Sequence, residues 1–216
     1  MTKSLIKLVV GLGNYSLPTT RHSVGMSALN KLADHLGVKW VYEKRCSGFI
    51  ANYLSEKFQV VLLKPKLAMN INGKSILKAV KTHGVLTDNI ILLQDDLDKP
   101  VGKLRIKLEG SASGHNGVRS AITSLKTDRL KRYKIGIGRP PDQSQVIEYV
   151  LGDFHANERH LVEETLKHCV DSLLDELELK DKLCNDNEEV DAQNCNKQMF
   201  FRSETNSLEC EKEVTS

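Results

Sequence analysis

The stretch LIKLVVGLGNYSLPTTRHSVGMSALNKLADHLG, residues 5–37, decides the fold. It begins with the apolar run LIKLVV, which is typical of a strand, and continues through glycines that let the chain turn sharply. From residue 23 to residue 36 the apolar positions recur at helical spacing, and Gly37 suits the position after a helix end. A strand, a loop and a helix in this order predict the first unit of an α/β fold.

The same alternation continues along the chain. Further strands are expected at 58–65, 89–94, 103–109 and 133–138, and further helices at 72–83, 116–126 and 157–179. The run KLRIKLE alternates apolar and basic residues, which predicts a strand with one solvated face and therefore a mixed sheet. We expect an α/β fold: a single three-layer α/β/α domain over residues 1–182, with a mixed central sheet flanked by helices. Residues 183–216 are rich in polar and acidic side chains and are expected to form an acidic, disordered tail.

Composition limits the class of protein. The chain is 40% hydrophobic and 27% charged, as in ordinary globular proteins, and no apolar run approaches the length of a membrane span. The first strand begins almost at once, so we expect no signal peptide and a cytoplasmic location, with a mitochondrial pool left open. The five cysteines are irregularly spaced without C-x-x-C, which favours reduced thiols over disulfides or a zinc site.

The net charge of +3 is unevenly distributed. Residues 181–216 contain nine acidic and four basic side chains, so residues 1–180 carry a net charge of +8. A basic globular part favours an anionic partner.

Two motifs suggest enzyme classes but lack a residue that each class requires. GLGNYS at 11–16 begins like a dinucleotide-binding loop, but Ser16 replaces the third glycine and Pro18 follows where the helix should run. GSASG at 110–114 resembles the nucleophile elbow of serine esterases, but Ala112 replaces the nucleophile. Neither class is favoured.

Other polar stretches stay open between a structural and a functional role. QDDLD at 94–98 can hold magnesium, form a solvated turn or orient a histidine. Asn70 precedes a helix and can cap it, although Asn72 competes for that position. GSASGHNGV at 110–118 is either a flexible loop or a backbone cradle for an oxyanion or a phosphate.

Five polar residues are more informative together than singly. A lone histidine at a helix start is more often structural than catalytic. In open α/β sheets, however, strand ends and helix starts converge on one crevice. A neutral base, an acid that orients it and three amides form a site that activates water beside a carbonyl, with no side-chain nucleophile and no metal cage. The residues that supply these groups are Asn14, His22, Asn70, Asp95 and Asn116.

Six blocks then occur in a characteristic order: VGLGN (10–14), TRHSVG (20–25), MNINGKS (69–75), DDLDKPVGKLRIK (95–107), SGHNGVRS (113–120) and IGIGRP (135–140). With these blocks the chain resembles the bacterial-type peptidyl-tRNA hydrolases over about residues 6–180. The resemblance implies an enzyme that hydrolyses the ester between a peptide and the 3′ end of tRNA and so recycles tRNA. It also implies a monomer with tRNA as its partner, without metal or cofactor and without a membrane.

The resemblance implies a role for each matched residue. The general base corresponds to His22 and its acidic partner to Asp95. Asn116 matches the asparagine that stabilises the oxyanion and binds substrate. The other substrate-binding positions match Asn14, Met69 and Asn70, and the pair that grips a tRNA phosphate matches Lys107 and Lys134.

Several positions depart from the family pattern. The usual Asn-Pro-Gly is Asn14-Tyr15-Ser16, and the loop that follows is shorter. Gln94 stands where a histidine commonly precedes the key aspartate. Lys134 is commonly arginine, so a bidentate fork becomes a point charge. These departures concern the entrance loop and the contacts with the CCA end of tRNA.

Two alternatives belong to other classes. A catalytically inactive RNA-binding protein on the same fold would not need the full set of polar residues. A small-molecule esterase would not need the basic strand at 103–107.

Overall fold

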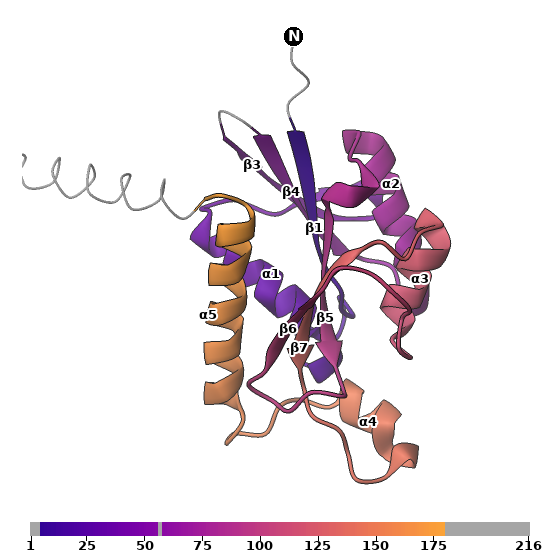
Figure 1. Ribbon diagram of the computed structural model, residues 1–216, viewed down its shortest axis with the longest axis vertical. Helices are drawn as coiled ribbons and strands as arrows, with labels where there is room; N and C mark the ends of the chain where they lie inside the picture. Colours follow the sequence, from indigo (N-terminus) through magenta and orange to yellow (C-terminus); the bar gives the residue numbers. More distant parts are fainter. Residues whose placement is uncertain (1–4, 56–57, 180–216) are drawn as a thin grey trace, which may run out of the picture. The chain divides into compact units, whose positions relative to one another are not determined.

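A computed structural model describes residues 5–55 and 58–179 (Figure 1). Within them the strands form one seven-stranded sheet in the order β2-β3-β4-β1-β5-β7-β6. The strands are β1 (Leu5–Gly11), β2 (Val41–Glu43), β3 (Gly48–Leu54), β4 (Phe58–Pro65), β5 (Ile90–Asp96), β6 (Leu104–Lys107) and β7 (Lys131–Gly136). The α-helices are α1 (Val24–His35), α2 (Gly73–His83), α3 (Asn116–Leu125), α4 (Val146–Leu151) and α5 (Arg159–Glu176).

The sheet is mixed, as expected. Strands β4, β1, β5 and β7 run parallel to one another, whereas β3 pairs antiparallel with β4, β2 with β3, and β6 with β7. All seven residues of β5 are buried, so this strand forms part of the core. Because the parallel strands end at the same edge of the sheet, loops that follow them meet there.

Helices cover both faces of the sheet (Figure 1). Helices α2 and α3 lie on one face, where Ile76 and Ala121 belong to one buried cluster with Val10 and Leu92 of the strands. Helix α1 lies on the other face. The expected α/β architecture with a mixed sheet between helices is therefore confirmed.

The start of α1 lies directly against the ends of two central strands. A Cβ atom added to Gly25 would lie 2.2 Å from the carbonyl oxygen of Leu93 and 2.7 Å from that of Leu12. Only a residue without a side chain allows the helix to approach the strand ends so closely. This contact places the residues just before α1 at the edge where the parallel strands end.

Strands β2 and β3 and one helix were not predicted from the sequence. Strand β2 is three residues long and mostly exposed, so it carries no alternating apolar pattern. Strand β3 includes the exposed Asn52, and the hydrophobic pattern alone does not distinguish this strand from a loop. Helix α4 has six residues, too few to show helical periodicity, and Ile147 within it is exposed.

The chain forms two compact units, one ending at Val170 and the other beginning at Asp171, so their boundary lies within helix α5. In the second unit the helix runs to Glu176, and Glu178 adopts a left-handed conformation. The tail expected at 183–216 lies outside the described residues. Every helix in the described parts of the chain is too short or too polar to cross a membrane.

Replacing Gly25 by alanine should lower the free energy of unfolding by about 1–3 kcal/mol, because overpacking a close contact costs this much. Chemical denaturation measures the loss. Gly152→Ala is the matched control, since its added Cβ would come no closer than 3.3 Å to the Glu148 carbonyl oxygen. A Gly25→Ala protein as stable as the control would contradict the close contact between α1 and the strands.

Candidate active site

A pocket of about 780 Å³ lies at the edge where β1 and β5 end. Its wall contains seven of the eight residues predicted to act in the site: Asn14, His22, Met69, Asn70, Asp95, Asn116 and Lys134. The eighth, Lys107, lies on the edge strand β6 and is not part of the pocket wall. The loops after the central strands thus bring together residues that lie far apart in the sequence.

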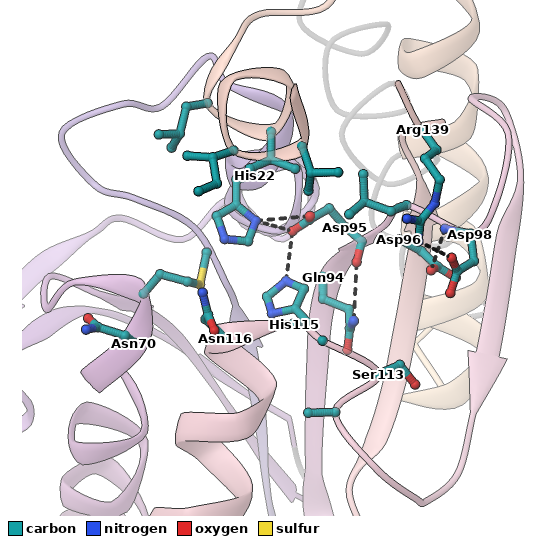
Figure 2. Close-up of a pocket in the computed structure, with 18 of the residues that line it drawn as sticks. His22, Asn70, Gln94, Asp95, Asp96, Asp98, Ser113, His115, Asn116 and Arg139 are labelled. Atoms are coloured by element: carbon teal, nitrogen blue, oxygen red, sulfur yellow. Dashed lines mark hydrogen bonds and ion pairs between the residues drawn. The ribbon is translucent and has the colours of Figure 1, made fainter. Parts of the chain in front are cut away.

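The core of the site is the pair formed by His22 and Asp95 (Figure 2). His22 belongs to a short 3-10 helix, Arg21–Ser23, that leads into α1, and Asp95 lies near the end of β5. The Nδ1 atom of His22 lies 2.9 Å from Oδ1 and 3.0 Å from Oδ2 of Asp95. The side chain of His22 is 13% exposed and that of Asp95 only 3%, so the ring reaches the pocket while the carboxylate stays covered.

The carboxylate of Asp95 stays ionised in this position. Burial alone raises the pKa of Asp95, but the interactions of its carboxylate with His115 and His22 outweigh this effect and hold the pKa well below its usual range. An ionised carboxylate only accepts hydrogen bonds, so Nδ1 of His22 carries the hydrogen. The neutral ring then keeps a lone pair on Nε2, which points away from Asp95 into the pocket (Figure 2).

A second histidine on the same carboxylate was not predicted. The Nε2 atom of His115 lies 2.8 Å from Oδ1 of Asp95. Its Nδ1 accepts the backbone N–H groups of Gly117 (3.1 Å) and Val118 (3.3 Å), so the ring caps the start of α3. These bonds assign the hydrogen to Nε2, which donates to Asp95. The stretch GSASGHNGV is compatible with a flexible loop or a backbone cradle, but its spacing does not identify His115 as a partner of Asp95.

The three side chains also meet the geometric requirement for a metal site. One ligand atom each from His22, Asp95 and His115 lies within 4.8 Å of the others. The ligand atom of His115 carries a proton, because its other nitrogen accepts two backbone N–H groups. A cation would have to displace that proton, so the hydrogen bonds in this structure favour a proton-transfer site over a metal centre.

Ser23 fixes the backbone of Asn14 relative to His22. The Ser23 hydroxyl accepts the backbone N–H of Asn14 (3.0 Å) and donates to the carbonyl oxygen of Leu17 (2.7 Å). The Thr20 hydroxyl donates to the same carbonyl at 3.0 Å. The short loop between β1 and α1 is therefore closed by its own side chains and holds two predicted site residues together.

The amide of Asn116 is oriented by its own helix. Its Oδ1 accepts a hydrogen bond of 3.3 Å from Arg119, which leaves the NH₂ group as the donor available to a ligand. Met69 is buried, and a Cβ added to Gly117 would lie 2.4 Å from its sulfur, so Met69 packs directly on the first turn of α3.

The two asparagines before α2 have different environments. Asn72 is fully buried at the N-cap position, but its side chain caps nothing and donates to the sulfur of Met69 at 3.3 Å. Asn70 is exposed on the pocket wall. Asn70 is therefore placed to contact a ligand, whereas Asn72 supports the wall from behind.

The two lysines predicted to bind phosphate differ in their exposure and in their neighbours. The ammonium group of Lys134 forms an ion pair of 2.9 Å with Asp96, and its side chain is only 12% exposed. Lys107 pairs with Arg132 across β6 and β7. Arg132 is itself buried and donates to the carbonyl oxygens of Ser111 (2.8 Å) and Gly110 (2.6 Å). Lys134 is therefore already paired with a carboxylate, whereas Lys107 lies on an edge strand.

Arg21 connects His22 with the segment around α4. Its guanidinium is buried, forms bonds of 3.2 and 2.6 Å with Glu158, and lies 4.3 Å from the ring centre of Tyr149 and 4.7 Å from that of Phe154. A bidentate pair between two rings has a single favourable arrangement. The residue before His22 is therefore fixed to the helix whose apolar side chains line the pocket. Those side chains are Val146, Ile147, Val150 and Leu151.

The ionised Asp95 should make stability depend on pH. The unfolded chain takes up a proton near the ordinary pKa of about 3.9, while the folded protein does not, so the free energy of unfolding decreases as the pH falls below that value. In Asp95→Asn this group cannot titrate. Between about pH 5 and pH 3 the variant should lose stability less steeply, by up to about 1.4 kcal/mol per pH unit. Urea denaturation at several pH values measures both slopes, and equal slopes would contradict the assignment.

The sequence is similar to one family of proteins over most of its length. The sequence model of the family described as "Peptidyl-tRNA hydrolase" matches residues 8–198. A mouse protein named "Probable peptidyl-tRNA hydrolase" is 44% identical over 172 residues, which cover 79% of this chain and 84% of that protein. A peptidyl-tRNA hydrolase from Sulfurihydrogenibium sp. is 34% identical over 189 residues, covering 85% of this chain and 99% of that protein.

Solved structures agree with the sequence matches. The crystal structure of peptidyl-tRNA hydrolase from Acinetobacter baumannii superposes with a TM-score of 0.75 at 29% identity, covering 86% of this chain and 94% of that chain. The sequence match spans most of the chain, and it includes every residue that builds the pocket. The chain belongs to the peptidyl-tRNA hydrolase family.

Proposed function

We propose that this protein hydrolyses the ester bond between a peptide and the 3′ end of tRNA, with His22 as the general base. Family membership supports the reaction and its tRNA substrate. The observation that carries the mechanism is the 2.9 Å contact between Nδ1 of His22 and Asp95, which leaves the second ring nitrogen facing the pocket.

The reaction requires one proton to move twice. Nε2 of His22 takes a proton from water as the water oxygen attacks the ester carbonyl. Asp95 holds the ring in the required tautomer and stabilises the imidazolium that forms. When the ester C–O bond breaks, the imidazolium returns its proton to the ribose oxygen. The products are tRNA and the free peptide, whose new carboxylic acid releases its proton to water.

Asn116 is the proposed donor to the developing oxyanion. Its amide oxygen is held by Arg119, so its NH₂ group can face a ligand in the pocket. Such a donor acts where negative charge develops in the transition state and is worth on the order of 10²–10³ in rate. Asn14 and Asn70 are the proposed contacts to the peptide backbone beside the ester, and Met69 supplies the apolar surface next to them.

The tRNA phosphates are the proposed partners of the basic side chains around β6. Phosphates carry charge without sequence information, so binding should be mainly electrostatic and similar for different tRNAs. Lys107 is the proposed phosphate contact. Lys134 also forms an ion pair with Asp96, so its charge is only partly available to a phosphate.

We propose further that the protein acts as a monomer in the cytosol. One chain supplies the complete acid–base pair and the surrounding pocket. The buried cysteines Cys46 and Cys169 are free thiols, as is usual in a reducing compartment.

The inactive RNA-binding alternative is not favoured. A protein that only binds RNA has no need for a buried carboxylate that receives hydrogen bonds from two histidines. Burying a charge costs free energy of folding, and this cost is better explained by a catalytic role than by RNA binding alone.

Replacing His22 by alanine should lower the rate of peptide release by on the order of 10²–10⁴ at saturating substrate, because the acid–base contribution is lost. The measurement is release of the acyl group from purified N-acetyl-aminoacyl-tRNA, run beside unblocked aminoacyl-tRNA. His160→Ala is the control, since this histidine is 86% exposed on α5. Hydrolysis by His22→Ala at the rate of the control would remove His22 from the role of base.

Replacing Lys107 by alanine should weaken tRNA binding and reduce the slope of log affinity against log salt concentration by about 1, as expected for one lost phosphate contact. Titration of deacylated tRNA at several salt concentrations measures the slope. Lys81→Ala, which removes an exposed lysine on α2, is the control. An unchanged slope for Lys107→Ala would place this side chain away from the tRNA.

A further inference from the structure

Three aromatic rings contact one another, beginning with Tyr15, which follows the pocket residue Asn14 in the sequence. The rings of Tyr15 and Phe49 are stacked, with centroids 4.7 Å apart and planes 8° apart. The ring of Tyr42 lies 5.3 Å from Phe49 at an angle of 58°. Tyr15 is 40% exposed and Tyr42 47% exposed, so the surface faces solvent. These three residues are called the aromatic platform below.

Two segments of the chain connect the aromatic platform with the wall of the pocket. Tyr15 follows Asn14, which lines the pocket. Phe49 and Tyr42 are cross-strand neighbours on β3 and β2. The start of β3 pairs with the end of β4, where Gly48 lies opposite Pro65, and the chain then leads directly to the pocket residues at 68–70.

The order of the strands separates the two halves of the substrate. The His22–Asp95 pair lies where the central strands β1 and β5 end, whereas Lys107 lies on β6 at one edge of the sheet. Two rings of the aromatic platform, those of Tyr42 and Phe49, lie toward the opposite edge, on β2 and β3. If RNA phosphates bind on the β6 side of the ester, the side toward β3 is a direction in which the peptide can extend.

We propose that the aromatic platform is a subsite for side chains of the bound peptide, beyond the amino acid that carries the ester. This inference rests on the proposed function, because it assigns the two halves of the proposed substrate to opposite sides of the site. Exposed aromatic rings bury apolar side chains and stack with other rings without requiring one sequence. The subsite should therefore prefer peptides with an aromatic or large apolar residue at the second or third position from the ester.

Lys66 contacts one ring of the aromatic platform. Its ammonium group lies 5.0 Å from the ring centre of Tyr42. One face of the Tyr15 ring is covered by Phe49, so a ligand can contact only the other face. A lysine beside aromatic rings also occurs in surfaces that stack nucleobases, so RNA is the competing occupant that the experiment has to separate.

A series of N-acetylated substrates on one tRNA tests the inference. The series carries one, two or three amino acids, with glycine or phenylalanine at the second and third positions. The variants are Tyr15→Ala, Tyr42→Ala on a different segment, and Tyr15→Phe, which keeps the ring. Leu86→Ala removes an exposed apolar side chain elsewhere and is the matched control.

The wild-type protein should hydrolyse the phenylalanine-containing peptides with a kcat/KM about three- to tenfold above that of the glycine peptides, the range expected for a stacked pair. Tyr15→Ala should abolish this preference and leave kcat/KM for the one-residue substrate unchanged. Tyr42→Ala should reduce the preference, and Tyr15→Phe and Leu86→Ala should retain it.

Three results would overturn the inference. The first is a wild-type protein without any preference, and the second is a preference that survives both alanine variants. The third is an equal loss on all substrates together with weaker binding of deacylated tRNA, which would assign the platform to RNA. If the wild-type protein hydrolyses none of the substrates, the proposed function itself is wrong. Failure of the subsite inference and failure of the proposed function therefore give different results.

Discussion

The carboxylate of Asp95 accepts hydrogen bonds from two histidines that belong to opposite layers of the fold. His22 precedes α1 on one face of the sheet, and His115 begins α3 on the other face, while Asp95 lies between them near the end of β5. An ion buried to this degree is tolerated only when its hydrogen-bonding capacity is satisfied. Both helix starts must therefore reach the same strand end, and the close contact at Gly25 is one consequence of that requirement.

The sheet arranges the proposed substrate along its strand order. Phosphate contacts are assigned to the β6 edge, bond cleavage to the middle, and peptide side chains to the β2–β3 edge. Each region uses a different interaction: charge on an edge strand, proton transfer in a covered pocket, and contact with exposed rings. Arg21 connects the segment that carries His22 with the segment around α4. The same side chain therefore helps to position both the polar and the apolar sides of the pocket.

Much of this could be predicted from the sequence, for identifiable physical reasons. Long apolar strands and amphipathic helices show their periodicity directly, so the central sheet and α1, α2 and α3 were placed within one or two residues at most boundaries. The convergence of polar residues at strand ends follows from the topology of α/β folds. Strand β2 and helix α4 have too few residues to show a period, and β3 has no clear alternating pattern. The role of His115 was missed because side-chain hydrogen bonds between distant residues leave no spacing in the sequence. The ion pair of Lys134 was missed for the same reason, since the run QDDLD does not show which of its carboxylates lies beside a lysine on another strand.

The cap that His115 provides connects two parts of the site. One nitrogen of this ring holds the first backbone N–H groups of α3, and Asn116 belongs to that same turn. The same ring donates to Asp95 through its other nitrogen. A change at His115 would therefore act on two parts of the site at once, on the carboxylate that orients the proposed base and on the turn that carries the proposed oxyanion donor. The two proposed halves of the chemistry, proton transfer and charge stabilisation, thus depend on a single side chain.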